Sequence, residues 1–174
     1  MAGAWIGLGS NLGDSRQTLL AAWQRLGSHT AIGLVQLSSL YQSQPVDMES
    51  SNWFVNAVGE LTTTLTPEQL LEQLLAIEQE FGRRRDPALP GYQDRTLDLD
   101  LLLYDDLVLK TARLELPHPR LHKRLFVLAP LAELAPDRVH PVLRQRMATL
   151  HDNLQAATRD NQSQAIRKLP KGTK

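Results

Sequence analysis

The sequence contains no cysteine, only 5% aromatic residues and no long hydrophobic run. Without cysteine, disulfide bonds and thiolate metal sites are excluded, and the composition fits a reducing compartment, so a cytoplasmic location is expected. No stretch of about 18 apolar residues occurs, and we therefore expect no membrane association through a spanning helix. The opening MAGAWIGLGSNLGD lacks the basic start and apolar stretch of a secretory signal.

Net charge is also absent, because 19 basic residues balance 19 acidic ones. This balance argues against a general binder of nucleic acids or membrane surfaces. The charges are nevertheless unevenly distributed: there are two basic and eight acidic residues before position 83, and 17 basic and 11 acidic residues from position 83 onward. The basic stretches GRRRD and HPRLHKR usually mean a solvated surface, but they also suit a polyanionic small molecule.

The order of predicted elements indicates the fold class. Hydrophobic periodicity predicts strands over 4–11, 32–46, 53–65, 97–104 and, briefly, 107–110, and helices over 14–27, 66–82, 119–135 and part of 143–158. Asp14 and Thr66 are suitable helix N-caps, and Gln69 completes a capping box with Thr66. This order predicts an α+β, ferredoxin-like sandwich with a mainly antiparallel sheet and flanking helices. We expect a single domain over 1–158 and a polar, flexible C-terminal tail over 159–174.

Two carboxylates interrupt the most apolar strand, RTLDLDLLLY at 95–104. Alternate side chains of a strand share a face, so Asp98 and Asp100 lie together, and Leu97, Leu99, Leu101 and Leu103 lie on the other face. The simplest interpretation is the solvated face of an amphipathic strand. However, Asp is a poor strand former, and Leu102, the next residue on this face, is apolar. A divalent cation such as Mg²⁺, completed by substrate phosphates, would remove the repulsion.

Other candidates are weaker when taken singly. Arg95 stands out among the basic residues because it lies three positions before Asp98, and guanidinium groups suit phosphate oxygens. Phe54 and Asn56 share a strand face and could stack on a flat heterocycle and bond its edge, although a core Phe beside a buried Asn is the commoner case. His118, between two prolines, is more often structural. The glycine-rich GLGSNLGD matches no phosphate-loop motif.

These motifs together resemble the 6-hydroxymethyl-7,8-dihydropterin pyrophosphokinase family (2-amino-4-hydroxy-6-hydroxymethyldihydropteridine diphosphokinase). The matching pieces run from Trp5 to Val142 and are GLGSNLGD, SSLYQSQPV, FVNAV, IEQEFGR, RTLDLDLLLY, LPHPRLHKRLFVLAPLAELAPD and VHP. The resemblance implies the same ferredoxin-like fold. It also implies transfer of pyrophosphate from ATP to the pterin hydroxymethyl oxygen, with release of AMP, in folate biosynthesis.

The resemblance also implies roles for individual residues. Asp98 and Asp100 match the family's binding residues for two Mg²⁺ ions and, with Arg83 and Arg95, its catalytic positions. The pterin-binding positions are Ser43, Val46, Phe54, Asn56 and Phe126. The nucleotide-binding positions are Glu78, Arg83, Arg85, Arg95, His118 and Arg124. We further expect a monomer that binds ATP and the pterin but neither nucleic acid nor membrane.

The chain departs from the family just before the arginine of its central motif. Many members have Trp and Pro there, whereas this chain has YQDR. Tyr92 could replace the Trp as a lid aromatic, and Asp94 would add negative charge near the phosphates.

Two alternatives remain open at the level of sequence. One is a D-x-D glycosyltransferase that uses a nucleotide sugar and Mn²⁺, which would need neither Phe54 nor Asn56. The other is a non-catalytic ferredoxin-like module that senses nucleotides or binds RNA.

Overall fold

A computed structural model of the chain describes residues 1–46, 50–82, 93–159 and 163–170. Its main elements, in chain order, are β1 (Ala2–Ser10), α1 (Ser15–Gly27), β2 (Ile32–Leu37), β3 (Tyr41–Ser43), β4 (Phe54–Thr63), α2 (Pro67–Glu80), β5 (Asp98–Tyr104), β6 (Leu109–Lys110), β7 (Glu115–Leu116), the 3₁₀ turn η1 (Leu121–Lys123), α3 (Leu125–Leu134), α4 (Met147–Arg159) and β8 (Ile166–Lys168). None of the helices in these described ranges has the length and apolar character of a membrane span.

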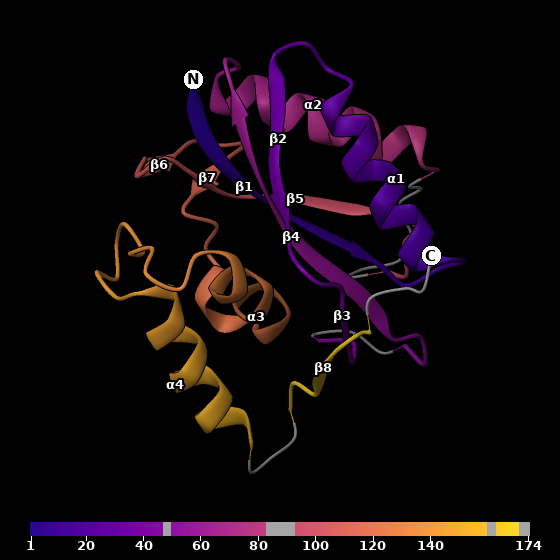
Figure 1. Cartoon of the computed structure of the whole chain (residues 1–174), viewed down its shortest axis with the longest axis vertical. Coiled ribbons are helices and arrows are strands. Elements are labelled where there is room, and N and C mark those ends of the chain that lie inside the picture. Colours follow the sequence, from indigo (N-terminus) through magenta and orange to yellow (C-terminus); the bar gives the residue numbers. More distant parts are fainter. Residues whose placement is uncertain (47–49, 83–92, 160–162, 171–174) are drawn as a thin grey trace.

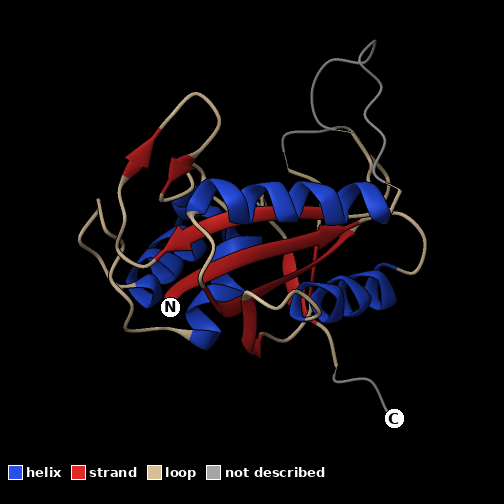
Figure 2. Cartoon of the chain, turned by 90° about the horizontal axis from the view of Figure 1, so that it is seen from above, coloured by secondary structure: helices blue, strands red, loops and turns tan. Residues whose placement is uncertain are grey.

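The strands form one main sheet between two layers of helices. Its order is β5-β1-β4-β3-β8, β2 pairs with β4 beside β3, and every described pairing is antiparallel. Helices α1 and α2 cover one face, and α3 and α4 lie on the other (Figure 1). Figure 2 shows β6 and β7 as a small hairpin apart from the main sheet. The antiparallel α+β sandwich expected from the sequence is therefore confirmed.

The two sequence-identified helix starts are present in the structure. Asp14 accepts a hydrogen bond from the Gln17 backbone N–H at 3.0 Å and caps α1. Thr66 and Gln69 form the reciprocal capping box of α2, with Pro67 in the first turn. These bonds satisfy donors that a helix leaves unpaired at its first turn.

A β-bulge divides the apolar residues of β5 between the two cores. Trp5 pairs with Leu103 and Ile6 with Leu101, so Leu102 is an extra residue in β5. The bulge turns both Leu102 and Leu103 toward α3 and α4, whereas Leu101 stays in the core beneath α1 and α2. The prediction that Leu103 shares a face with the other odd-numbered leucines was therefore wrong.

Two further segments differ from expectation. The single strand predicted over 32–46 is two strands, because Ser38 interrupts the regular ladder with β4. The Ser38 N–H donates to the Val58 C=O at 2.9 Å, and the Ser38 hydroxyl accepts the Val58 N–H at 3.0 Å. The segment expected to be a tail contains β8, which pairs with β3. The prediction of a polar, flexible tail over 159–174 did not include this strand pairing at Ile166–Lys168.

Candidate active site

Three neighbouring strands place an amide, a glycine and a carboxylate in one row across the sheet. In the register of β4, β1 and β5, Gly9 pairs with Asn56 on one side and with Asp98 on the other. A Cβ added at Gly9 would lie only 3.2 Å from Asn56 Oδ1. The missing side chain therefore leaves open space between the two polar groups.

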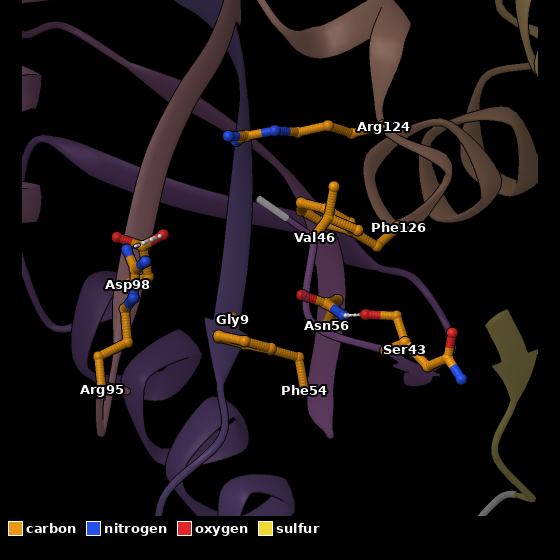
Figure 3. A pocket seen from close by; sticks show the side chains of 10 residues that line it. Gly9, Ser43, Val46, Phe54, Asn56, Arg95, Asp98, Arg124 and Phe126 are labelled. Atoms are coloured by element: carbon orange, nitrogen blue, oxygen red, sulfur yellow. Dashed lines mark hydrogen bonds and ion pairs between the residues drawn. The ribbon is translucent and has the colours of Figure 1, made fainter. Parts of the chain in front are cut away.

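The three residues of this row line one pocket together with Arg124 and Phe126, which lie at the start of α3 (Figure 3). The pocket contains about 430 Å³ of empty space, including the part that opens to solvent. Apolar and aromatic walls with a few placed polar groups are typical of a small-molecule site. The lining residues are Gly9, Ser43, Gln44, Val46, Phe54, Asn56, Arg95, Asp98, Arg124 and Phe126.

One half of the pocket suits a flat heterocycle. Phe54 starts β4 and Phe126 lies in the first turn of α3, so two aromatic rings from different layers line one space. Asn56 is 4% exposed and donates a hydrogen bond from Nδ2 to Ser43 Oγ at 2.8 Å. This bond orients the amide, whose remaining groups can pair with the polar edge of a ring.

The other half carries the charged groups. Arg95 Nη1 lies 3.0 Å from Asp98 Oδ2, and the Arg124 guanidinium carbon lies 5.4 Å from the centre of the Phe126 ring. Asp100 neighbours Gly7 as Asp98 neighbours Gly9. Burial, followed by the charge of Asp98, raises the pKa of Asp100 to about 7, and Arg124 opposes this shift.

This carboxylate pair fits a hard divalent cation. No group of three or more His, Cys, Asp or Glu side chains with metal-binding geometry occurs within the described residues. Two carboxylates are nevertheless sufficient for Mg²⁺, which keeps water ligands and takes its other oxygens from substrate phosphates. A cation between Asp98 and Asp100 would also offset the repulsion that raises the pKa of Asp100.

Glu78 approaches β5 from beneath the sheet. It is 2% exposed on α2, and its Oε1 accepts a hydrogen bond from the Leu99 N–H at 2.7 Å. Leu99 lies between the two aspartates in sequence, so Glu78 fixes the backbone that carries both of them. The sequence indicated a nucleotide-side residue here, but no pattern indicated this contact with the strand edge.

His118 is held in a defined tautomer at the end of the β7 segment. Its backbone N–H donates to the Leu102 C=O at 2.9 Å, and its Nδ1 accepts the Arg120 N–H at 3.1 Å. Burial, then the charges of Arg124 and Arg120, lower the pKa of His118 to about 4. The ring is therefore neutral at pH 7 and carries its hydrogen on Nε2, as a donor.

The structure brings most of the predicted site residues to one pocket. All five proposed pterin contacts line it, together with Arg95, Asp98 and Arg124, whereas Asp100, Glu78 and His118 do not. Arg83, Arg85 and Tyr92 lie outside the described residues. Sequence reasoning missed Gly9 and Gln44. The spacing of Gly7 and Gly9 within a strand was the available signal for the first.

The fold and the site define a class of small α+β proteins whose pocket joins a carboxylate and arginine half to an aromatic half. The sequence model of the 7,8-dihydro-6-hydroxymethylpterin-pyrophosphokinase (HPPK) family matches residues 5–136. The chain belongs to this family. Neither the D-x-D glycosyltransferase nor the sensing module is favoured by that membership.

Individual relatives agree with the family match. The chain is 44% identical over 131 residues to a 2-amino-4-hydroxy-6-hydroxymethyldihydropteridine pyrophosphokinase of Bacillus subtilis. This alignment covers 75% of this chain and 77% of the Bacillus protein. It is also 44% identical over 139 residues to the Synechocystis protein of the same name, in an alignment that covers 80% of this chain and 69% of the Synechocystis protein. A crystal structure described as HPPK-DHPS in complex with substrates aligns with a TM-score of 0.74 at 12% identity. That alignment covers 92% of this chain but only 44% of the other, and it supports the fold alone.

Proposed function

We propose that this chain transfers the pyrophosphoryl group of ATP to the hydroxymethyl oxygen of 6-hydroxymethyl-7,8-dihydropterin, with release of AMP, as a Mg²⁺-dependent step of folate biosynthesis. The observation that carries the proposal is the pocket itself, in which Phe54, Phe126 and Asn56 lie beside Arg95, Asp98 and Arg124. Family membership supports the reaction, and the geometry supports the assignment of its residues.

The aromatic half would bind the pterin. The ring would stack between Phe54 and Phe126, and Asn56 would bond its polar edge in the orientation set by Ser43. Val46 closes the same half of the pocket. Because these groups come from β3, β4 and α3, the ring would be oriented before reaction and its hydroxymethyl group directed toward the charged half.

The charged half would hold the triphosphate. Asp98 and Asp100 would bind Mg²⁺, two ions by analogy with the family, and the bound cation would neutralise phosphate charge and favour deprotonation of the hydroxymethyl group. Arg95 and Arg124 would contact the phosphates, and neutral His118 would donate from Nε2. Glu78, Arg83 and Arg85 complete the proposed nucleotide side.

An end-point assay with ATP, Mg²⁺ and the pterin, separating AMP from ADP, tests the proposal. We expect stoichiometric AMP that disappears with EDTA. Asp98→Ala and Asp100→Ala are each expected to lower kcat by about 100-fold or more, because each removes a proposed ligand of the cation that would position the phosphates. Glu72→Gln is a matched control, since its carboxylate is exposed and pairs only weakly with Arg113 at 3.2 Å.

Other products would contradict parts of the proposal. ADP with a singly phosphorylated pterin would retain the metal site but overturn pyrophosphoryl transfer. Full activity in EDTA would overturn the Mg²⁺ dependence. The proposal also includes a cytoplasmic monomer, and light scattering of the purified protein would contradict the monomer if it gave twice the mass of 19.5 kDa.

A further inference from the structure

The carboxylate of Asp94 joins the segment that follows β1 to the segment that precedes β4, at the end of the sheet where Gly9 and Phe54 line the pocket. Its Oδ1 accepts a hydrogen bond from Asn11 Nδ2 at 2.7 Å, and its Oδ2 accepts one from Asn52 Nδ2 at 2.9 Å. Asn11 directly follows β1, and Asn52 lies two residues before Phe54, where β4 begins. We name these three side chains the Asp94 clasp. The sequence indicated that Asp94 adds negative charge near the phosphates, and the structure shows that both oxygens of this carboxylate accept hydrogen bonds within the protein.

The same asparagine also fixes Arg95. Asn11 Oδ1 accepts the Arg95 backbone N–H at 2.8 Å, and the Asn11 backbone N–H donates to the Arg95 C=O at 3.1 Å. Because its oxygen is occupied in this way, Asn11 can offer only its Nδ2 group to Asp94. Arg95 in turn lies 3.0 Å from Asp98. A continuous series of hydrogen bonds and one ion pair therefore runs from Asn52 to the proposed metal ligand.

The local electrostatics keep Asp94 ionised. A hydrogen bond from Ser50 and others from Asn11 and Asn52, together with the charge of Arg95, lower the pKa of Asp94 against the opposing effect of burial. Hydrogen bonds to an ionised carboxylate are roughly twice as strong as neutral ones. An uncharged replacement would therefore make a weaker connection even where its shape is the same.

We propose that Asp94 is a positioning residue that holds the start of β4, with Phe54 and Asn56, at a fixed separation from Arg95 and Asp98. The aromatic and charged halves of the pocket belong to different segments, and in-line transfer requires both substrates to be aligned to within a fraction of an ångström. This role rests on the proposed function for the division of labour between the two halves. The contacts of the clasp themselves do not depend on the identity of the substrates.

Exchanging the donor and acceptor across the clasp separates its role from that of simple charge. Asp94→Ala removes the bonds from Asn11 and Asn52 and also the one from Ser50. Asn52→Asp places a second carboxylate against that of Asp94, and the repulsion between the two charges should push Asn52's segment away from Asp94. In the double variant Asp94→Asn with Asn52→Asp, the new amide can accept from Asn11 and donate to the new carboxylate, so both bonds are restored. Asp94→Asn alone should be mild, because Asn52 can turn its amide to accept.

Trp53 supplies a readout that does not require activity. It adjoins Asn52 and is 39% exposed, whereas Trp5 and Trp23, the other tryptophans, are 3% and 7% exposed. Acrylamide quenching of fluorescence therefore reports mainly on the start of β4. We expect Asp94→Ala and Asn52→Asp to raise the quenching constant about twofold, because Trp53 would change from partial to nearly full exposure when the start of β4 is released. The double variant should return the quenching constant toward the wild-type value.

Kinetics then test positioning. We expect Asp94→Ala and Asn52→Asp to lower kcat/KM by about 10- to 100-fold, as small misplacements do, with recovery in the double variant and with far-UV circular dichroism unchanged. Unchanged kinetics in either single variant, or a double variant no better than Asn52→Asp, would overturn the proposal. So would altered quenching with normal kinetics. If the wild-type protein turned over no pterin, the proposed function would fail, and quenching would still decide whether Asp94 holds the start of β4.

Discussion

At the scale of single residues, the pocket depends on a side chain that is absent. Gly9 lies between Asn56 and Asp98 on the central strand β1, at the junction of the aromatic and charged halves. A methyl group at this position would project toward the Asn56 oxygen at 3.2 Å, closer than most real contacts of a Cβ. Glycine here is explained by close approach of a neighbouring group and not by an unusual backbone angle.

We therefore predict that Gly9→Ala weakens pterin binding selectively. The amide of Asn56 must shift away from the ring edge, and an about tenfold rise in KM for the pterin is expected, equivalent to ~1.4 kcal/mol, with a smaller change for ATP. Steady-state kinetics with each substrate varied in turn measure this difference. Gly7→Ala is the matched control, because its Cβ would meet Leu102 at an ordinary 3.5 Å. Equal effects of both variants on the pterin would contradict the explanation.

Site residues that follow strand periodicity could be predicted from the sequence. Asp98 and Asp100, or Phe54 and Asn56, are two residues apart, and alternation alone places each pair on one face. The contact of Glu78 with the backbone of Leu99 could not be predicted, because it joins a helix to an edge strand across 21 positions. The resemblance identified Glu78 as a site residue, but only the packing of α2 against β5 indicates what its carboxylate contacts.

At the scale of elements, the C-terminal segment supports both walls of the aromatic half. Its strand β8 pairs with β3, with Ile166 opposite Ser43, and the Ala165 C=O accepts the Gln44 N–H at 3.1 Å. On the other wall, Gln164 Oε1 accepts the Leu125 N–H at 2.8 Å and its Nε2 donates to the Lys123 C=O at 3.0 Å. A side chain from beyond the family match therefore caps α3 between Arg124 and Phe126.

We predict that Gln164→Ala destabilises the protein by about 1 kcal/mol, the usual cost of losing an N-terminal cap, and raises KM for the pterin about threefold through movement of Phe126. Urea unfolding and steady-state kinetics give the two values. Gln155→Ala, at an exposed position of α4, makes the same chemical change without loss of a cap and should alter neither. A normal KM in a destabilised Gln164→Ala protein would limit the residue to stability.

Elements with strong local signals were predictable and short ones were not. The caps Asp14 and Thr66 act within four residues, so the starts of α1 and α2 could be identified directly. Strand β8 has three residues, too few for a period, and its pairing depends on a partner more than 120 positions away. The break between β2 and β3 likewise depends on Ser38 replacing the ladder with side-chain and backbone bonds to Val58.

At the scale of the whole molecule, Glu133 connects the α3 layer to the edge of the sheet. Its Oε1 accepts the Ser39 N–H at 2.9 Å, and its Oε2 accepts the Tyr41 hydroxyl at 2.6 Å. The ammonium group of Lys168 in β8 lies 3.0 Å from the same carboxylate. One side chain thus links α3, β3 and β8, the elements that surround the aromatic half.

This connection predicts a specific loss of stability in acid. Although burial acts in the opposite direction, hydrogen bonds from Tyr41, Ser39 and Lys168 lower the pKa of Glu133 from 4.5 to about 2. As pH falls, the unfolded chain binds this proton first, so the stabilisation is complete above about pH 5 and is lost progressively toward pH 2. Glu133→Gln should cost about 1–2 kcal/mol at pH 7, after allowance for solvent screening, and much less at pH 3.

Urea unfolding of both proteins at pH 7, 5 and 3 measures this dependence. The difference in free energy of unfolding between wild type and Glu133→Gln should shrink as the pH falls. Below about pH 5 the Glu133 carboxyl takes up a proton in the unfolded chain but not yet in the native protein, and this proton uptake favours unfolding. Glu72→Gln should differ from wild type by less than about 0.5 kcal/mol at every pH, since its ion pair is exposed. A difference for Glu133→Gln that stays constant from pH 7 to pH 3 would mean that packing, and not the ionised carboxylate, connects α3 to β3 and β8.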